Sequence, residues 1–276
     1  MTAAGGGLAA GAGMTLNAPV PAAPPGGIHM SIQLEICAVS PEDCVVAETA
    51  GAHRVELNSA LLLGGLTPSL GCLQEARAAV RLPIIAMLRP RAGGFAYSAA
   101  EFRVLLRDLE LCLAAGADGI AFGILLSDGR VDAERCRAVV RLAAGKTTVF
   151  HRAFDVTPEP LVALEQLIDL GVTRVMTSGQ EASAYNGAAN IATYVQQVAG
   201  RLEILPAGGI NRFTVADVVA RTGCRQVHAS LGTTRPDPSV LARPQVAFGG
   251  TLKPPEDSFG VTDARAVAGM LRLLGE

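Results

Sequence analysis

The chain has 276 residues, of which half are hydrophobic and 17% are charged, and its formal net charge is -2. This low and balanced charge excludes a nucleic-acid surface and a polybasic membrane anchor, so a small-molecule or protein partner is expected. No apolar run reaches the roughly 18 residues of a spanning helix, and no membrane segment is predicted. Six scattered cysteines without a Cys-x-x-Cys pair indicate a reducing cytoplasm, not a secreted disulfide scaffold.

Residues 1–30 consist mainly of Gly, Ala and Pro and carry almost no charge. Such a segment cannot bury enough apolar surface to offset its ordering entropy, so a disordered leader is predicted. A secretory signal is not expected, because no Lys or Arg precedes Arg54, and Met30 offers an alternative start. Residues 31–276 are expected to form a single domain.

From Ile32 onward one unit repeats: a short run rich in Val, Ile and Leu, a polar or glycine turn, and a longer segment with helical spacing. This alternation predicts parallel strands joined by crossover helices. The predicted strands are 33–37, 54–58, 83–91, 119–125, 147–155, 174–179, 203–210 and 226–230. Helix-stop glycines precede every second strand at Gly51, Gly116, Gly171 and Gly223. Eight units predict an α/β fold of the TIM-like (β/α)8 barrel class, with an open doubly wound sheet as the competing fold.

In such a barrel the reactive groups lie at the carboxyl ends of the strands. The first three predicted strands each carry two polar groups, two residues apart, and side chains at that spacing share one face of a strand. These pairs are Glu35 with Cys37, Glu56 with Asn58, and Arg89 with Arg91. The two arginines are expected to pair with the carboxylates or to hold an anionic ligand. A structural ion-pair network that plugs the barrel is the competing interpretation.

The fifth predicted strand carries His151 and Asp155 on one face and Arg152 on the other. Burying such groups unpaired costs several kcal/mol, so they are predicted to bind or react. We expect His151 to act as a general acid or base with a pKa near neutrality. Because about 13 Å separates positions four apart on a straight strand, His151 and Asp155 are expected to act across a ligand unless the chain turns. A satisfied core histidine beside an unrelated aspartate is the alternative.

The last three predicted strands also end in small or polar residues, which are Ser178, Gly208, Gly209, His228 and Ser230. Glycines let backbone N–H groups approach a ligand, and the loops after strands seven and eight often hold phosphate in barrel enzymes. Tight-turn chemistry is the alternative explanation of the glycine pair. Residues 233–260 have no clear periodicity and five prolines, so they are predicted to form a lid or a subunit contact.

Six motifs in chain order resemble the CutC family. They are Leu34-Glu-Ile-Cys37, Arg54-Val-Glu-Leu57, Gly64-Gly-Leu-Thr-Pro-Ser69, Arg89-Pro-Arg91, Phe150-His-Arg-Ala-Phe-Asp155 and Thr177-Ser-Gly-Gln180. The resemblance implies a TIM-like barrel, a cytoplasmic location, a homo-oligomer that is a dimer or larger, and a role in copper binding or trafficking.

The chain departs from the family at its copper thiols. Cys37 is kept, but Ala38 and Asn58 stand where further cysteines are found in the family. Cys37 and His228 are the predicted metal ligands, and one thiol is a poor site for Cu(I), which prefers soft sulfur. Three functions therefore stay open: copper homeostasis through metal binding, an enzyme for a small anionic metabolite, or a binding scaffold. The enzyme would use His151, Asp155, Glu35 and Glu56.

Overall fold

The computed structural model describes residues 32–250 and 254–275, which belong to a compact unit spanning Ser31–Glu276. The predicted leader, residues 1–30, lies outside the described residues. All eight predicted strands are present; seven begin at the predicted residue and the third begins one residue later. They are β1 (Gln33–Ala38), β2 (Arg54–Leu57), β3 (Ile84–Met87), β4 (Gly119–Phe122), β5 (Thr147–Phe150), β6 (Arg174–Thr177), β7 (Glu203–Pro206) and β8 (Gln226–Ala229).

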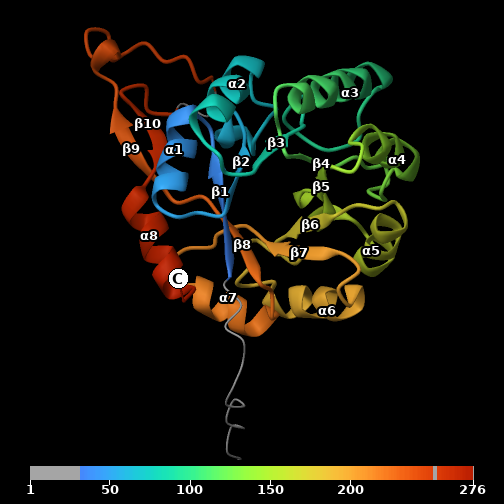
Figure 1. Ribbon diagram of the computed structural model, residues 1–276. Coiled ribbons are helices and arrows are strands. Elements are labelled where there is room, and N and C mark those ends of the chain that lie inside the picture. The colour runs from blue at the N-terminus through green and yellow to red at the C-terminus, as the bar shows by residue number, and fades with distance from the viewer. Residues whose placement is uncertain (1–31, 251–253, 276) are drawn as a thin grey trace, which may run out of the picture. The chain divides into compact units, whose positions relative to one another are not determined.

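The eight strands form one parallel sheet that curves into a nearly closed barrel, with the helices around its outside (Figure 1). Strand β1 pairs with both β2 and β8, which an open doubly wound sheet does not allow in this order. The TIM-like barrel prediction is therefore confirmed. The remaining seam lies between β7 and β8, where the Gln226 side chain donates a hydrogen bond to the Ile204 carbonyl at 3.2 Å.

Eight α-helices alternate with or follow these strands in the described residues. They are α1 (Pro41–Thr49), α2 (Leu70–Ala79), α3 (Ala99–Ala114), α4 (Ala133–Leu142), α5 (Pro160–Asp169), α6 (Ala188–Val198), α7 (Val215–Thr222) and α8 (Ala264–Leu273). The four predicted helix-stop glycines all have positive φ, between 71° and 95°, as a left-handed helix end requires. Among the helices that the structure describes, none is long and apolar enough to cross a membrane.

The strand alternation divides the buried residues between two regions. Side chains such as Leu34, Val55 and Val227 face the helices and belong to the main core. The opposite faces of β3 to β7 fill one half of the barrel interior with a small apolar cluster: Ile85, Met87, Ala121, Val149, Met176, Leu205 and Ala207. The other half, lined by β1, β2 and β8, is polar and contains buried carboxylates and a histidine. This polar half positions the candidate site.

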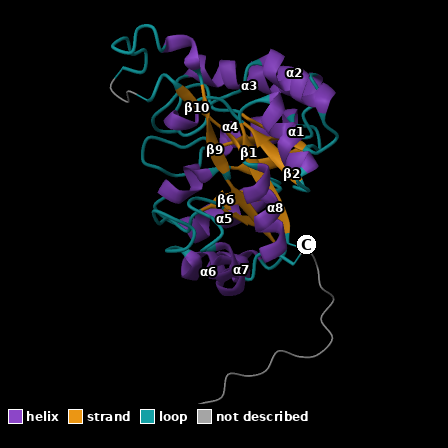
Figure 2. Cartoon of the chain, turned by 90° about the vertical axis from the view of Figure 1, so that its left-hand side faces the viewer, coloured by secondary structure: helices purple, strands orange, loops and turns teal. Residues whose placement is uncertain are grey.

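The segment after β8 is more regular than its sequence predicts. Residues 232–236 form β9 (Gly232–Pro236) and pair antiparallel with β10 (Ser258–Thr262), which leads into α8. We call 232–262 the arm; Figure 2 views the barrel from the side of β9, β10 and α8. The Thr262 N–H donates to the buried Asp43 carboxylate on α1 at 2.6 Å and fixes the base of the arm. Its predicted role as a lid or subunit contact stays a prediction.

Candidate functional site

A cavity of about 420 Å³ lies at the carboxyl ends of the barrel strands. Eleven of the fourteen residues predicted for the site line this cavity. They are Cys37, Glu56, Asn58, Arg89, His151, Arg152, Asp155, Gly208, Gly209, His228 and Ser230. The three that do not are Glu35, Arg91 and Ser178. Sequence reasoning missed Phe95 and Met176, which also line the cavity.

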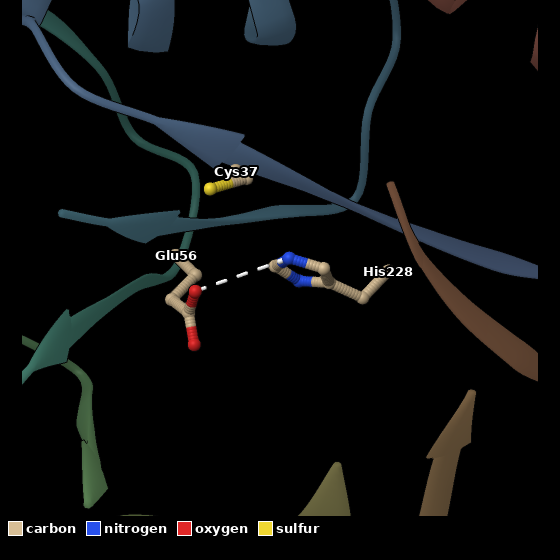
Figure 3. Close-up of side chains that lie close together, drawn as sticks. All are labelled: Cys37, Glu56 and His228. Atoms are coloured by element: carbon tan, nitrogen blue, oxygen red, sulfur yellow. Dashed lines mark ion pairs between the residues drawn. The ribbon is translucent and has the colours of Figure 1, made fainter. Parts of the chain in front are cut away.

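Three side chains in the polar half form a candidate metal site, shown close together in Figure 3. Cys37 lies on β1, Glu56 on β2 and His228 on β8, and one ligand atom from each lies within 4.8 Å of the others. We call these three residues the trio. The register explains their proximity, because Cys37 pairs with Glu56 across β1 and β2, while the neighbouring strand β8 supplies His228.

Glu35 orients the histidine of the trio from below. The Glu35 carboxylate lies 2.8 Å from Nδ1 of His228. The other ring nitrogen, Nε2, therefore faces the other two residues of the trio and lies 3.9 Å from the Glu56 carboxylate. A carboxylate that holds the second ring nitrogen of a metal-binding histidine is a common arrangement in metalloproteins. The partners of the Glu35 carboxylate are thus His228 and Arg54.

Burial and charge set the protonation of the trio. Burial by itself would lower the pKa of His228, but hydrogen bonds to Cys37 and Glu35 and the charges of both glutamates raise it well above 6.5. Burial raises the pKa of the Cys37 thiol and of the Glu56 carboxyl. For Glu35, Arg54 and His228 outweigh burial and lower the pKa to about 2. These shifts favour the protonated form of the His228 imidazole and of the Cys37 thiol.

Below the trio, polar side chains form an ion-pair network, but it is built on Arg54 and Arg174 and not on the predicted Arg89 and Arg91. Arg54 bonds to Glu35 and also donates to the side-chain oxygens of Gln33 at 2.8 Å and Gln226 at 2.6 Å. Arg174 pairs with Glu203 at 2.6 Å. The residues of this network do not line the cavity. The barrel interior therefore holds a structural ion-pair network below the trio and a separate cavity at the carboxyl ends of the strands.

His151 is held as a neutral hydrogen-bond donor. Its Nδ1 accepts the Ala153 N–H at 3.1 Å, so the proton of the neutral ring lies on Nε2, which is buried and has no partner in the described residues. Burial, together with the charge of Arg89, lowers the pKa of His151 to about 3. The expected pKa near neutrality is wrong, because no carboxylate is among the causes that act on this ring.

Asp155 reaches the mouth because the strand ends earlier than predicted. Strand β5 stops at Phe150, and a short 3-10 helix, η2 (Arg152–Val156), turns the chain. The Asp155 carboxylate accepts from Arg152 Nε at 2.8 Å and from the Ser178 N–H and hydroxyl at 3.0 and 2.9 Å. Asp155 thus braces the loops after β5 and β6, and its oxygens are occupied by groups of the protein.

In the described residues, neither of the two arginines after β3 pairs with Glu35 or Glu56. Arg89 lines the cavity, and its guanidinium donates to the carbonyls of Leu63, Gly65 and Gly93 at 2.8 to 3.0 Å. Arg91 turns away and pairs with Glu101 at 2.5 Å on α3. Residues two apart share a face only within a strand. Because β3 ends at Met87, before either arginine, Arg89 and Arg91 are not held on one face.

The fold and the mouth together define a single (β/α)8 barrel with a polar, potentially metal-binding site at the strand ends. The chain belongs to the CutC family, which matches residues 32–233. It is 51% identical over 231 residues to a family protein CutC of Treponema denticola, covering 84% of this chain and 94% of that one.

More distant relatives carry a functional name. The human copper homeostasis protein cutC homolog is 39% identical over 234 residues, with 85% of this chain and 86% of that protein covered. A crystal structure of a CutC protein from Streptococcus agalactiae has 31% identity and a TM-score of 0.69, and the match covers 71% of this chain and 97% of that one.

Proposed function

We propose that this protein binds copper as cargo at the trio of Cys37, Glu56 and His228. The observation that carries the proposal is the position of His228 Nε2, which Glu35 directs toward the thiol and the Glu56 carboxylate. A thiolate and an imidazole suit copper, and three protein ligands leave room for exchange of a transported ion. The copper homeostasis names of the mammalian relatives support the same reading.

The donor set fits one copper ion held weakly. The trio contains a single thiol, that of Cys37. Asn58 stands directly after β2 where the family has a cysteine, and its Nδ2 lies 3.5 Å from the Cys37 sulfur. Met87, a further soft donor, lines the same cavity. Because copper must displace protons from Cys37 and His228, its affinity should fall as the pH is lowered.

An anaerobic competition titration with a chromophoric Cu(I) chelator tests this proposal. We expect one weakly bound ion per chain and at least a tenfold loss for Cys37→Ala, whereas Cys72→Ala, which removes a half-buried thiol outside the cavity, leaves binding unchanged. Asn58→Cys should strengthen binding by about tenfold or more, since it adds a second soft ligand beside Cys37. Tight, stoichiometric binding that survives Cys37→Ala would refute the copper site.

The cytoplasm is the compartment that we propose for this function, because all six cysteines are free thiols. The alternative, an enzyme for a small anionic metabolite, has one observation in its favour: the cavity of about 420 Å³ exceeds what a single ion needs. The neutral His151 and the fully bonded Asp155 do not support acid–base work by that pair.

A further inference from the structure

Arg89 is a buried cation that has no anionic partner among the described residues. Its side chain belongs to a residue only 7% exposed, and all its hydrogen bonds go to main-chain carbonyls. The other two buried arginines of the described chain, Arg54 and Arg174, each pair with a glutamate. Because a buried charge is costly unless an opposite charge accompanies it, Arg89 indicates that an anion comes from outside the chain.

A second unmatched group lies at the same cavity. The Nε2–H of His151 is buried and finds no hydrogen-bond acceptor in the described part of the chain, and the Ala153 N–H on Nδ1 prevents the ring from switching tautomer. Phe95 contacts both groups, with its ring 5.1 Å from the His151 ring and 5.3 Å from the Arg89 guanidinium carbon. A neutral N–H and a fixed cation are donors that an oxyanion can satisfy together.

The loop after β7 adds main-chain donors. Gly208 and Gly209 line the cavity with φ of 98° and 71°, and within the described residues neither N–H makes a hydrogen bond. Consecutive glycines in this conformation let backbone N–H groups face a ligand closely. Of the described carboxylates that line the cavity, Asp155 is bonded to Arg152 and Ser178, and Glu56 belongs to the trio, so neither pairs with Arg89.

We propose that the mouth binds the carboxylate or phosphate group of a small metabolite through Arg89 and His151, with Gly208 and Gly209 supplying backbone donors. The groups of this anion subsite follow β3, β5 and β7, and His151, which follows β5, lies four strands from β1 of the trio. A volume of about 420 Å³ suits a compact metabolite of a few carbon atoms. The subsite goes beyond copper binding and does not require it.

Isothermal titration of the metal-free, full-length protein with inorganic phosphate or malonate, at constant ionic strength, tests the subsite. We expect saturable binding of at least one anion, a loss of about tenfold or more in both Arg89→Gln and His151→Gln, and an unchanged affinity in Arg91→Gln. Arg91→Gln is the matched control because Arg91 lies outside the cavity and is paired with Glu101.

The outcomes separate the possible ligands and the two proposals. Binding of phosphate alone assigns a phosphate ester, binding of malonate alone assigns a carboxylate, and binding of both assigns a subsite that accepts either group. If Arg89→Gln does not fold, as circular dichroism would show, His151→Gln decides the result. Absence of binding for both anions, or an equal loss in Arg91→Gln, overturns the subsite. Cys37→Ala should retain anion binding, so failure of the copper site leaves this test intact.

Discussion

Replacing Glu35 by Gln should destabilise the barrel strongly, because Glu35 links the trio to the barrel floor. Its carboxylate is 1% exposed and contacts Arg54 and His228. The substitution keeps the shape of the side chain but removes its charge, which leaves two cationic groups buried with less compensation. Loss of one partner from a buried ion pair typically costs about 3–5 kcal/mol, since the remaining charge stays desolvated.

The pKa of Glu35 gives an independent magnitude. The folded protein lowers it from 4.5 to about 2, and a difference of about 2.5 pH units corresponds to about 3 kcal/mol at neutral pH. Since the folded-state pKa is depressed, this stabilisation is fully present above about pH 4.5 and is lost as the pH falls toward 2. For a domain of this length, about 3 kcal/mol lowers Tm by about 6–12 °C.

Urea unfolding of wild type and Glu35→Gln, from pH 7 down to pH 3, measures both effects. The variant should be about 3 kcal/mol less stable at pH 7 and should lose less stability on acidification. Glu165→Gln is the matched control, because Arg201 lowers the pKa of Glu165 to about 2 as well, but on the solvent-exposed surface. That pair is screened by water and salt, so only a small change is expected. A Glu35→Gln protein within about 1 kcal/mol of wild type would contradict the reasoning.

Two further predictions concern the loops and the arm. Asp155→Asn should weaken the brace between the loops after β5 and β6, so that hydrogen exchange at the Ser178 amide becomes faster; unchanged protection would show that Asp155 is not a brace. Residues 233–260 should form a lid or subunit contact that covers Phe259, which is 47% exposed in the single chain, so Phe259→Glu should shift the assembly toward monomer in light scattering. Rapid proteolysis throughout 233–260, with a monomeric barrel before and after cutting, would contradict this role.

The barrel could be predicted from sequence because its repeating signals are local. Each strand begins where an apolar run follows a helix-stop glycine or a polar turn, and seven of the eight starts are correct. The strand ends are less predictable, because the alternation of apolar and polar residues continues in the sequence after the chain has left the sheet. The fifth predicted strand continues to Asp155, but β5 ends at Phe150. The Ala153 N–H donates to Nδ1 of His151, and this hydrogen bond accompanies the turn by which the chain leaves the sheet.

The site was predictable only where neighbouring residues on one strand carry it. Glu56 follows directly from its strand, whereas the contact between Glu35 and His228 joins residues 193 positions apart across the closure of the barrel. That contact depends on the register of β8 against β1, which no local pattern specifies. Phe95 carries no signal, since it comes from a loop. Met176 lies within the predicted strand 174–179, but an apolar side chain on a strand carries no signal that separates cavity lining from core.

The division of the barrel interior explains how opposite charges persist within one mouth. On the side of β1, β2 and β8, Glu35 and Glu56 raise the pKa of His228 and favour a cation. In the loops after β3 and β5, main-chain carbonyls hold Arg89 in place, and burial together with the Arg89 charge lowers the pKa of His151. The charges that shift the pKa of His228 are those of Glu56 and Glu35, and the charge that shifts the pKa of His151 is that of Arg89, so each ring responds mainly to its nearest charged neighbours. One side therefore has the chemistry of a cation site and the other that of an anion site, with a single cavity between them.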